Sequence, residues 1–153
     1  MATFKGLFNL QPPKDLLGKL ERDFTRLKMA PMDTCAAFDF FVTAEHMLDW
    51  IYPNDEGQRR NERSNETLLQ ACSHLADDSK HFVAAAKRHK SVKDAREETG
   101  AFQADFVQAD AFDIGKLVAK LNGDAARRLR PSIEVVDLAG RVLDFWKKHR
   151  LQP

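Results

Sequence analysis

Apolar residues recur at steps of three and four along two early stretches of the chain, and this spacing predicts two amphipathic helices. In residues 12–29 the stripe consists of Leu16, Leu17, Leu20, Phe24 and Leu27. Residues 33–53 are apolar around most of the helix circumference, and Asp33 is the expected N-cap of this second helix. We therefore expect the second helix to be the central and most buried element.

Two later stretches also have helical periodicity. A third helix is expected from about Asn65 to Lys87, and its apolar stripe consists of Leu68, Leu69, Cys72, Leu75, Ala76, Phe82, Val83 and Ala86. The segment that precedes it, residues 54–66, has no apolar residue, which is typical of a solvated loop or a frayed helix start. Residues 132–153 predict a C-terminal helix with Val135, Leu138, Ala139, Val142 and Trp146 on one face.

The stretch at about residues 114–130 allows two interpretations. Ile114, Leu117 and Leu121 fit a helix that ends at Gly123. The alternation of Leu117, Ala119 and Leu121, followed by Asn122–Gly123, fits a two-stranded hairpin, because Asn-Gly readily adopts the positive φ angles of a tight turn. We favour the hairpin, while residues 101–112 give no clear signal. The predicted fold class is mainly α (α+β): a single domain, residues 1–153, with a bundle of three long helices, a C-terminal helix and a small β-hairpin appendage.

Composition and charge then narrow the class of protein. The content of 43% hydrophobic and 31% charged residues is ordinary for a globular protein. The net charge is +1, so the chain has no overall positive potential that would attract nucleic acid or a membrane surface. No apolar run approaches the roughly 18 residues of a membrane span. Two cysteines, Cys35 and Cys72, are too few for a disulfide framework or a metal knuckle, and we expect both to be buried thiols in a reducing compartment. The expectation is a soluble cytoplasmic protein.

Residues that can bind a metal or take part in catalysis are most concentrated in "CSHLADDSKHF", residues 72–82. On a helical wheel His74 and His81 share one side, opposite the apolar stripe, and aspartates flank them. This side is either a solvent-facing strip or the lining of a groove or interface. The preceding helix has its own polar strip, which consists of Asp39, Thr43, His46 and Asp49.

If these two strips face each other, their side chains make one site. The candidate cluster is then His46, Asp49, His74, Asp78, Lys80 and His81. Facing helices of a bundle hold transition metals with imidazoles and carboxylates, so His46, His74 and His81 are candidate ligands of a divalent ion. The wheel does not establish that the strips face each other. HExxH, a nucleophile elbow and a phosphate-binding loop are all absent from the sequence, so no catalytic residue is assigned and enzymatic activity stays open.

Basic residues gather in two short clusters that are candidates for nucleic-acid binding. They are Lys87, Arg88 and Lys90 in the first cluster and Arg127, Arg128 and Arg130 in the second. Together they can form one phosphate-binding surface. The alternative is separate solvated basic spots, which the near-neutral total charge favours.

Several of these segments resemble known helical proteins. "FDFFVTAEHMLDW", "CSHLADDSKHF" and "LDFWKKH" resemble a pattern found in small bacterial helical-bundle proteins, a resemblance that implies a bundle and no particular activity. "DDSKH" is more distantly similar to a helix turn of HEPN-like bundles from toxin–antitoxin and phage-defence systems. The catalytic Arg–His motif of that family has no counterpart here, since Arg141 and His149 are too far apart. This second resemblance implies RNA binding or antitoxin-like work without RNA cleavage.

These observations lead to one main functional hypothesis and two alternatives. We expect a non-catalytic interaction or regulatory module that binds a protein partner or associates with itself as a homodimer. The reason is a surplus of aromatic residues that point in several directions from the second helix: Phe38, Phe40, Phe41, Trp50 and Tyr52. The alternatives are a metal-binding bundle enzyme that uses the His/Asp cluster and an RNA-binding protein that uses the basic clusters.

Overall fold

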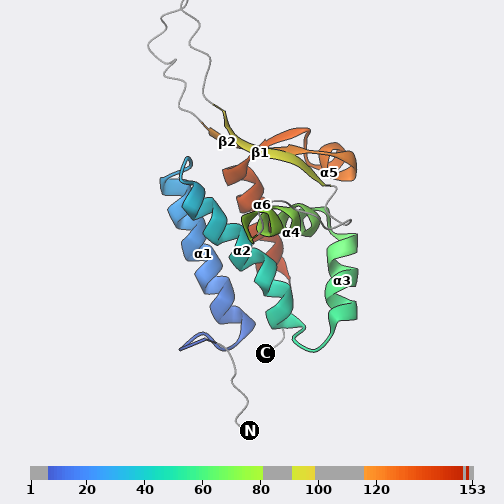
Figure 1. The fold of residues 1–153 in the computed structure, drawn as a ribbon. Coiled ribbons are helices and arrows are strands. Elements are labelled where there is room, and N and C mark those ends of the chain that lie inside the picture. The colour runs from blue at the N-terminus through green and yellow to red at the C-terminus, as the bar shows by residue number, and fades with distance from the viewer. Residues whose placement is uncertain (1–6, 81–90, 99–115, 150, 152–153) are drawn as a thin grey trace, which may run out of the picture.

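A computed structural model describes residues 7–80, 91–98, 116–149 and 151 of the chain. The described part is mainly helical and carries a small antiparallel sheet (Figure 1). The helices are α1 (Pro13–Met29), α2 (Thr34–Ile51), α3 (Glu56–Asn65), α4 (Thr67–Lys80), α5 (Gly123–Arg128) and α6 (Val135–Lys148). The strands are β1 (Val92–Glu98), β2 (Lys116–Leu121) and β3 (Ser132–Glu134).

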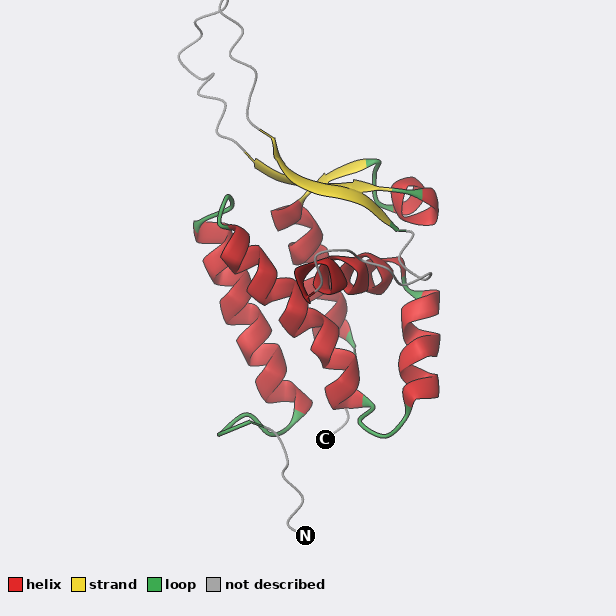
Figure 2. Cartoon of the chain, viewed as in Figure 1, coloured by secondary structure: helices red, strands yellow, loops and turns green. Residues whose placement is uncertain are grey.

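The helices and the sheet form two parts of one packed structure. α1 and α2 lie side by side and run in opposite directions, and the sheet lies over α4 and α6 at one end of the helices (Figure 2). This arrangement confirms the mainly helical class with a small β element. None of the described helices is long and apolar enough to cross a membrane.

The start of α2 follows directly from its sequence. The carboxylate of Asp33 accepts hydrogen bonds from the backbone N–H groups of Cys35 and Ala36, at 2.9 and 3.1 Å, and so caps the helix as predicted. Beyond this first turn, α2 contributes Phe40, Phe41, Ala44, Met47 and Leu48 to the core. The second helix is therefore central, as its apolar circumference predicts.

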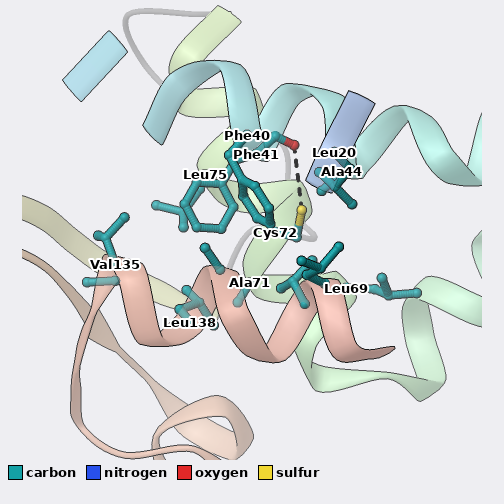
Figure 3. Packing of buried hydrophobic residues seen from close by; sticks show 14 of the residues in the cluster. Leu20, Phe40, Phe41, Ala44, Leu69, Ala71, Cys72, Leu75, Val135 and Leu138 are labelled. Atoms are coloured by element: carbon teal, nitrogen blue, oxygen red, sulfur yellow. Dashed lines mark hydrogen bonds between the residues drawn. The ribbon is translucent and has the colours of Figure 1, made fainter. Parts of the chain in front are cut away.

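α4 is as deeply buried as α2. Six consecutive residues of α4 are buried, from Ala71 to Ala76, which means that neighbours cover this helix on every side. Figure 3 shows Cys72 and Leu75 packed against Phe40 and Phe41, where the Cys72 thiol lies 3.6 Å from the backbone carbonyl oxygen of Phe41 and donates to it. Trp146 of α6 is fully buried as well.

The sheet has the order β1-β2-β3, and both pairs of strands are antiparallel. In β2, Ala119 pairs with Ala95 of β1 on one side and with Ile133 of β3 on the other. A β-bulge interrupts the β1–β2 register between Val92 and Asp94. The sheet thus joins a strand that follows α4 to the segment that leads into α6.

In the hairpin predicted at about residues 114–130, the first strand is confirmed and the turn is wrong. Lys116–Leu121 is a strand, but Asn122–Gly123 does not form a two-residue turn. Gly123 has a φ of 53° and begins the short helix α5, which separates β2 from its antiparallel neighbour β3. The positive φ that suggested a hairpin turn is present, and it serves as the entry to a helix instead.

Two further predictions need correction. Residues 54–66 are largely the regular helix α3, whose N-cap Asp55 accepts from the backbone N–H of Gln58 at 2.8 Å. The C-terminal helix begins at Val135 and not at Ser132, because Ile133 belongs to β3 and pairs with β2. The predicted third helix corresponds to α4 as far as Lys80, and its expected continuation to Lys87 lies outside the described residues, as do residues 101–112.

Candidate functional site

His74, a member of the predicted cluster, is buried and contacts the first residue of β1. Its side chain is 8% exposed, and its Nδ1 accepts a hydrogen bond from the backbone N–H of Val92 at 3.2 Å. Of the two interpretations, a solvent-facing strip or the lining of a groove or interface, the first is therefore wrong for His74. The wheel places it opposite the apolar stripe, but the sheet covers that side of α4.

The polar strip of α2 does not gather against α4 but is divided between two neighbouring helices. Asp39 forms an ion pair with Arg26 of α1 at 2.8 Å, and Asp49 lies 3.4 Å from Arg59 of α3. Thr43 is buried against α1. His46 is half-buried on α2. The described members of the strip thus serve mainly as links between helices.

The metal prediction stays a prediction. Among the described residues, the structure has no group of three or more His, Cys, Asp and Glu side chains that could hold an ion. The candidate ligand His81 and the side chains of Asp78 and Lys80 lie outside the described residues.

The nucleic-acid prediction is likewise untested. Lys87, Arg88 and Lys90 lie outside the described residues. Arg127 and Arg128 are exposed on α5, where Arg127 pairs with Asp124, and Arg130 is exposed just beyond it. These arginines are accessible.

A buried ion pair that the sequence did not indicate joins α2 to α3. Arg63 donates to the Glu45 carboxylate at 2.5 Å, and the two side chains are 20% and 12% exposed. Burial raises the pKa of Glu45, while the positive charge of Arg63 opposes that rise. The same surroundings hold the pKa of the Cys72 thiol well above its ordinary value, chiefly through burial and then through the charge of Glu45. The Glu45–Arg63 pair is therefore a structural contact beside the hydrophobic core.

A concave surface lies elsewhere, between α2, α4 and the sheet. It is an apolar groove of about 300 Å³, lined by Thr34, Ala37, Phe38, Phe41, Leu75, Ala95, Arg96, Glu97, Leu117 and Val135. We call it the α2–β1 groove. Phe38, one of the aromatic residues singled out for contact with a second chain, is 45% exposed at this groove.

The α2–β1 groove is lined by three consecutive residues of β1: Ala95, Arg96 and Glu97. Leu117, the partner of Glu97 on β2, also lines it. Within the described part of the chain, β1 pairs with β2 alone, so its other edge has no strand beside it.

Edge strand β1 is strongly charged and of mixed sign. Of its residues, Lys93 and Arg96 are basic, whereas Asp94, Glu97 and Glu98 are acidic. Glu98 pairs with Lys120 of β2 at 2.7 Å, and the hydrogen bond from Lys120 lowers the pKa of Glu98. Lys93 and Glu97 are exposed. The site therefore combines an apolar groove with a strand that carries charges of both signs and, among the residues the structure places, pairs only with β2.

Comparisons with protein-family models, with curated proteins and with solved structures each found no match.

Proposed function

We propose that this protein is a non-catalytic interaction module that binds an extended segment of a partner protein along β1. The bound segment adds a strand to the sheet through main-chain hydrogen bonds and places alternate side chains in the α2–β1 groove. Other protein domains recognise extended peptides at a sheet edge in this way. Main-chain hydrogen bonds provide the affinity, and pockets for alternate side chains provide the specificity.

One observation carries this proposal: three residues of β1, which pairs only with β2 within the described part of the chain, line the apolar groove. Leu75 and Leu117 are buried at the base of the groove, while Phe38 is exposed at the groove. An apolar surface beside the edge of a strand offers a partner strand both apolar and main-chain contacts.

The test is photocrosslinking in the expressing cell with p-benzoylphenylalanine in place of Phe38. The matched control places the same photoreactive residue at Phe8, which is aromatic and 87% exposed. Phe8 belongs to the segment before α1, which lies at the end of the helices away from the sheet (Figure 1). The proposal predicts a crosslink to a defined peptide, identified by mass spectrometry, from position 38 and not from position 8. It also predicts that Ala95→Arg abolishes this crosslink, because a long charged side chain then occupies the groove that Ala95 lines.

Ala95 is exposed, so Ala95→Arg is compatible with folding, and a thermal melt monitored by circular dichroism checks this. Equal crosslinking from both positions, the absence of any crosslink at position 38, or a crosslink that survives Ala95→Arg would each overturn the proposal.

A further inference from the structure

We propose that Asn122 is a site of spontaneous deamidation, at which the folded chain converts an asparagine into aspartate and isoaspartate. The reaction is intramolecular. The backbone nitrogen of Gly123 attacks Cγ of Asn122 and gives up its proton, which leaves with the side-chain nitrogen as ammonia while a cyclic succinimide forms. Water then opens the ring at either of its two carbonyl groups. The site is independent of the proposed function.

The sequence places the two residue types that favour this reaction side by side. Of the asparagines in the chain, only Asn122 precedes a glycine. Asparagine is a thermally labile residue. Glycine has no Cβ to crowd its nitrogen during the attack, and its backbone rotates with little steric resistance. The sequence therefore favours Asn122 over every other asparagine of the chain.

The structure leaves both reacting groups accessible. Asn122 and Gly123 are exposed at the junction of β2 and α5. The N–H of Gly123 lies in the first turn of α5, where a helix offers no carbonyl acceptor, and it donates to no group in the described part of the chain. Asn122 is the N-cap residue, yet its side chain makes no capping hydrogen bond. Neither the nucleophile nor the amide must therefore leave a hydrogen-bond partner before they react.

The backbone N–H groups that follow the other asparagines are held by hydrogen bonds. Three of them follow Asn9, Asn54 and Asn65, and each donates to a backbone carbonyl. These pairs are Leu10–Leu7 at 2.9 Å, Asp55–Tyr52 at 3.3 Å and Glu66–Glu62 at 3.1 Å. The fourth follows Asn61, which lies inside α3. A nitrogen in such a bond must release its acceptor before it can attack, so the structure selects the same asparagine as the sequence.

One hydrogen bond opposes the reaction at Asn122. The Asn122 carbonyl oxygen accepts from the N–H of Ala126 at 3.2 Å. Ring closure turns the peptide group between Asn122 and Gly123 and breaks this bond. The bond belongs to the first turn of the six-residue helix α5, and terminal turns of helices open readily. The fold should therefore slow the reaction by no more than about tenfold relative to the unfolded chain, as expected for the loss of one hydrogen bond.

The two products differ in their effect on this junction. Aspartate keeps the backbone path, and its carboxylate is a favourable N-cap for α5. In isoaspartate the backbone runs through Cβ and Cγ and is one carbon longer. The N–H of Asn122 donates to the carbonyl oxygen of Ser91 at 2.9 Å, next to the paired residues Val92 and Leu121. The longer path changes the connection from this bond to α5, so isoaspartate should loosen α5 from the sheet.

The first experiment follows deamidation in the purified full-length protein at neutral pH and body temperature over several weeks. Trypsin cleaves after Lys120 and Arg127 and releases residues 121–127 as one peptide, which liquid chromatography and mass spectrometry resolve into its asparagine, aspartate and isoaspartate forms. The reaction at Asn122 should proceed at a rate within about tenfold of that in urea, whereas the other asparagines should stay unchanged in the folded protein. Asn122→Gln is the matched control, because glutamine keeps an amide but forms the corresponding larger ring much more slowly.

The second experiment measures the effect of the product by hydrogen exchange. The isoaspartate form is separated from the aged protein by chromatography and compared with fresh wild type and with Asn122→Asp. The Asn122→Asp variant carries the same new charge without the longer backbone. Backbone amides of residues 121–130 should exchange several-fold faster in the isoaspartate form, and at the wild-type rate or more slowly in Asn122→Asp.

Two results of the first experiment would overturn the site: Asn122 that stays intact in the folded protein while it reacts in urea, or equal reaction at Asn54. Equal exchange in the isoaspartate form and in Asn122→Asp would overturn the loosening of α5. None of these results affects the proposed function, because the crosslink from position 38 does not depend on residue 122.

Discussion

His74 accepts a hydrogen bond from the backbone N–H of Val92 at 3.2 Å, and this bond ties α4 to the first residue of β1. A ring nitrogen that accepts a hydrogen bond carries no proton, so the neutral imidazole of His74 is protonated at Nε2. Both His74 and Val92 are buried. The contact therefore anchors the edge strand of the proposed interface on the helical core.

Removing this acceptor should destabilise the protein. His74→Leu replaces the imidazole with an apolar side chain and leaves the Val92 N–H buried without a partner, at a cost of about 1–3 kcal/mol in the free energy of unfolding. His74→Asn retains an acceptor close to the position of Nδ1 and should lose less. Urea denaturation of the two variants and the wild type measures the difference. Equal losses for Leu and Asn would show that packing, and not the hydrogen bond, is what His74 contributes.

The helices that bury an apolar stripe could be predicted from the sequence. α1 and α2 lie where the periodicity places them, and α6 differs only at its start, because Ile133 joins the sheet. Pattern reasoning works here because each of these helices packs a continuous apolar face. Cys72 is buried as predicted, whereas Cys35 is exposed, since it lies in the first turn of α2, before that helix enters the core.

α3 and the site could not be predicted in the same way. α3 has no buried residue, and polar contacts such as Arg63–Glu45 and Arg59–Asp49 attach it to α2. The spacing of hydrophobic residues in the sequence does not indicate such polar contacts. The helical wheel placed His74 opposite the buried stripe because it assumes that a helix buries one face. Neighbouring elements cover α4 on every side, so His74 is buried as well. The α2–β1 groove joins elements distant in sequence and has no local signature.

A partly buried polar triangle connects α1 to α2. Lys19 donates to Asp23 at 2.6 Å and to Thr43 at 2.8 Å, and the Thr43 hydroxyl donates to Asp23 at 2.8 Å. Thr43→Val is nearly isosteric but deprives two charged groups of a partner, so it should cost about 1.5–3 kcal/mol. The matched control is Thr25→Val on the exposed side of α1, which should stay within about 0.5 kcal/mol. Guanidinium unfolding curves test the contrast, and similar costs at both positions would contradict it.

Two glycines inside helices should respond differently to alanine. A Cβ added at Gly18 of α1 meets nothing within 4 Å, so Gly18→Ala should raise the free energy of unfolding by about 0.5–1 kcal/mol, as expected for helix interiors. A Cβ at Gly140 of α6 meets the Phe24 ring at 3.3 Å, which is tight. Gly140→Ala should therefore gain less than Gly18→Ala. Thermal melts compare the two variants, and a larger gain at Gly140 would show that the Phe24 ring yields freely.

The buried Glu45 should make stability depend on pH in a direction opposite to that of most ion-paired carboxylates. Because burial raises its pKa, the folded protein holds a proton that the unfolded chain has already released at pH values just above the ordinary glutamate pKa. Stability from this group is full below the unfolded pKa and is lost as the pH rises through the folded pKa.

Glu45→Gln removes this titration while leaving a polar partner for Arg63. The difference in unfolding free energy, wild type minus Glu45→Gln, should therefore fall as the pH rises from about 4.3, the ordinary glutamate pKa, and become constant above the raised pKa of Glu45. Urea unfolding at a series of pH values measures it, with Glu56→Gln on the exposed side of α3 as the control for loss of a carboxylate. A difference that instead rises with pH would mean that the charge of Arg63 outweighs burial, so that the Glu45 pKa is lowered in the folded protein.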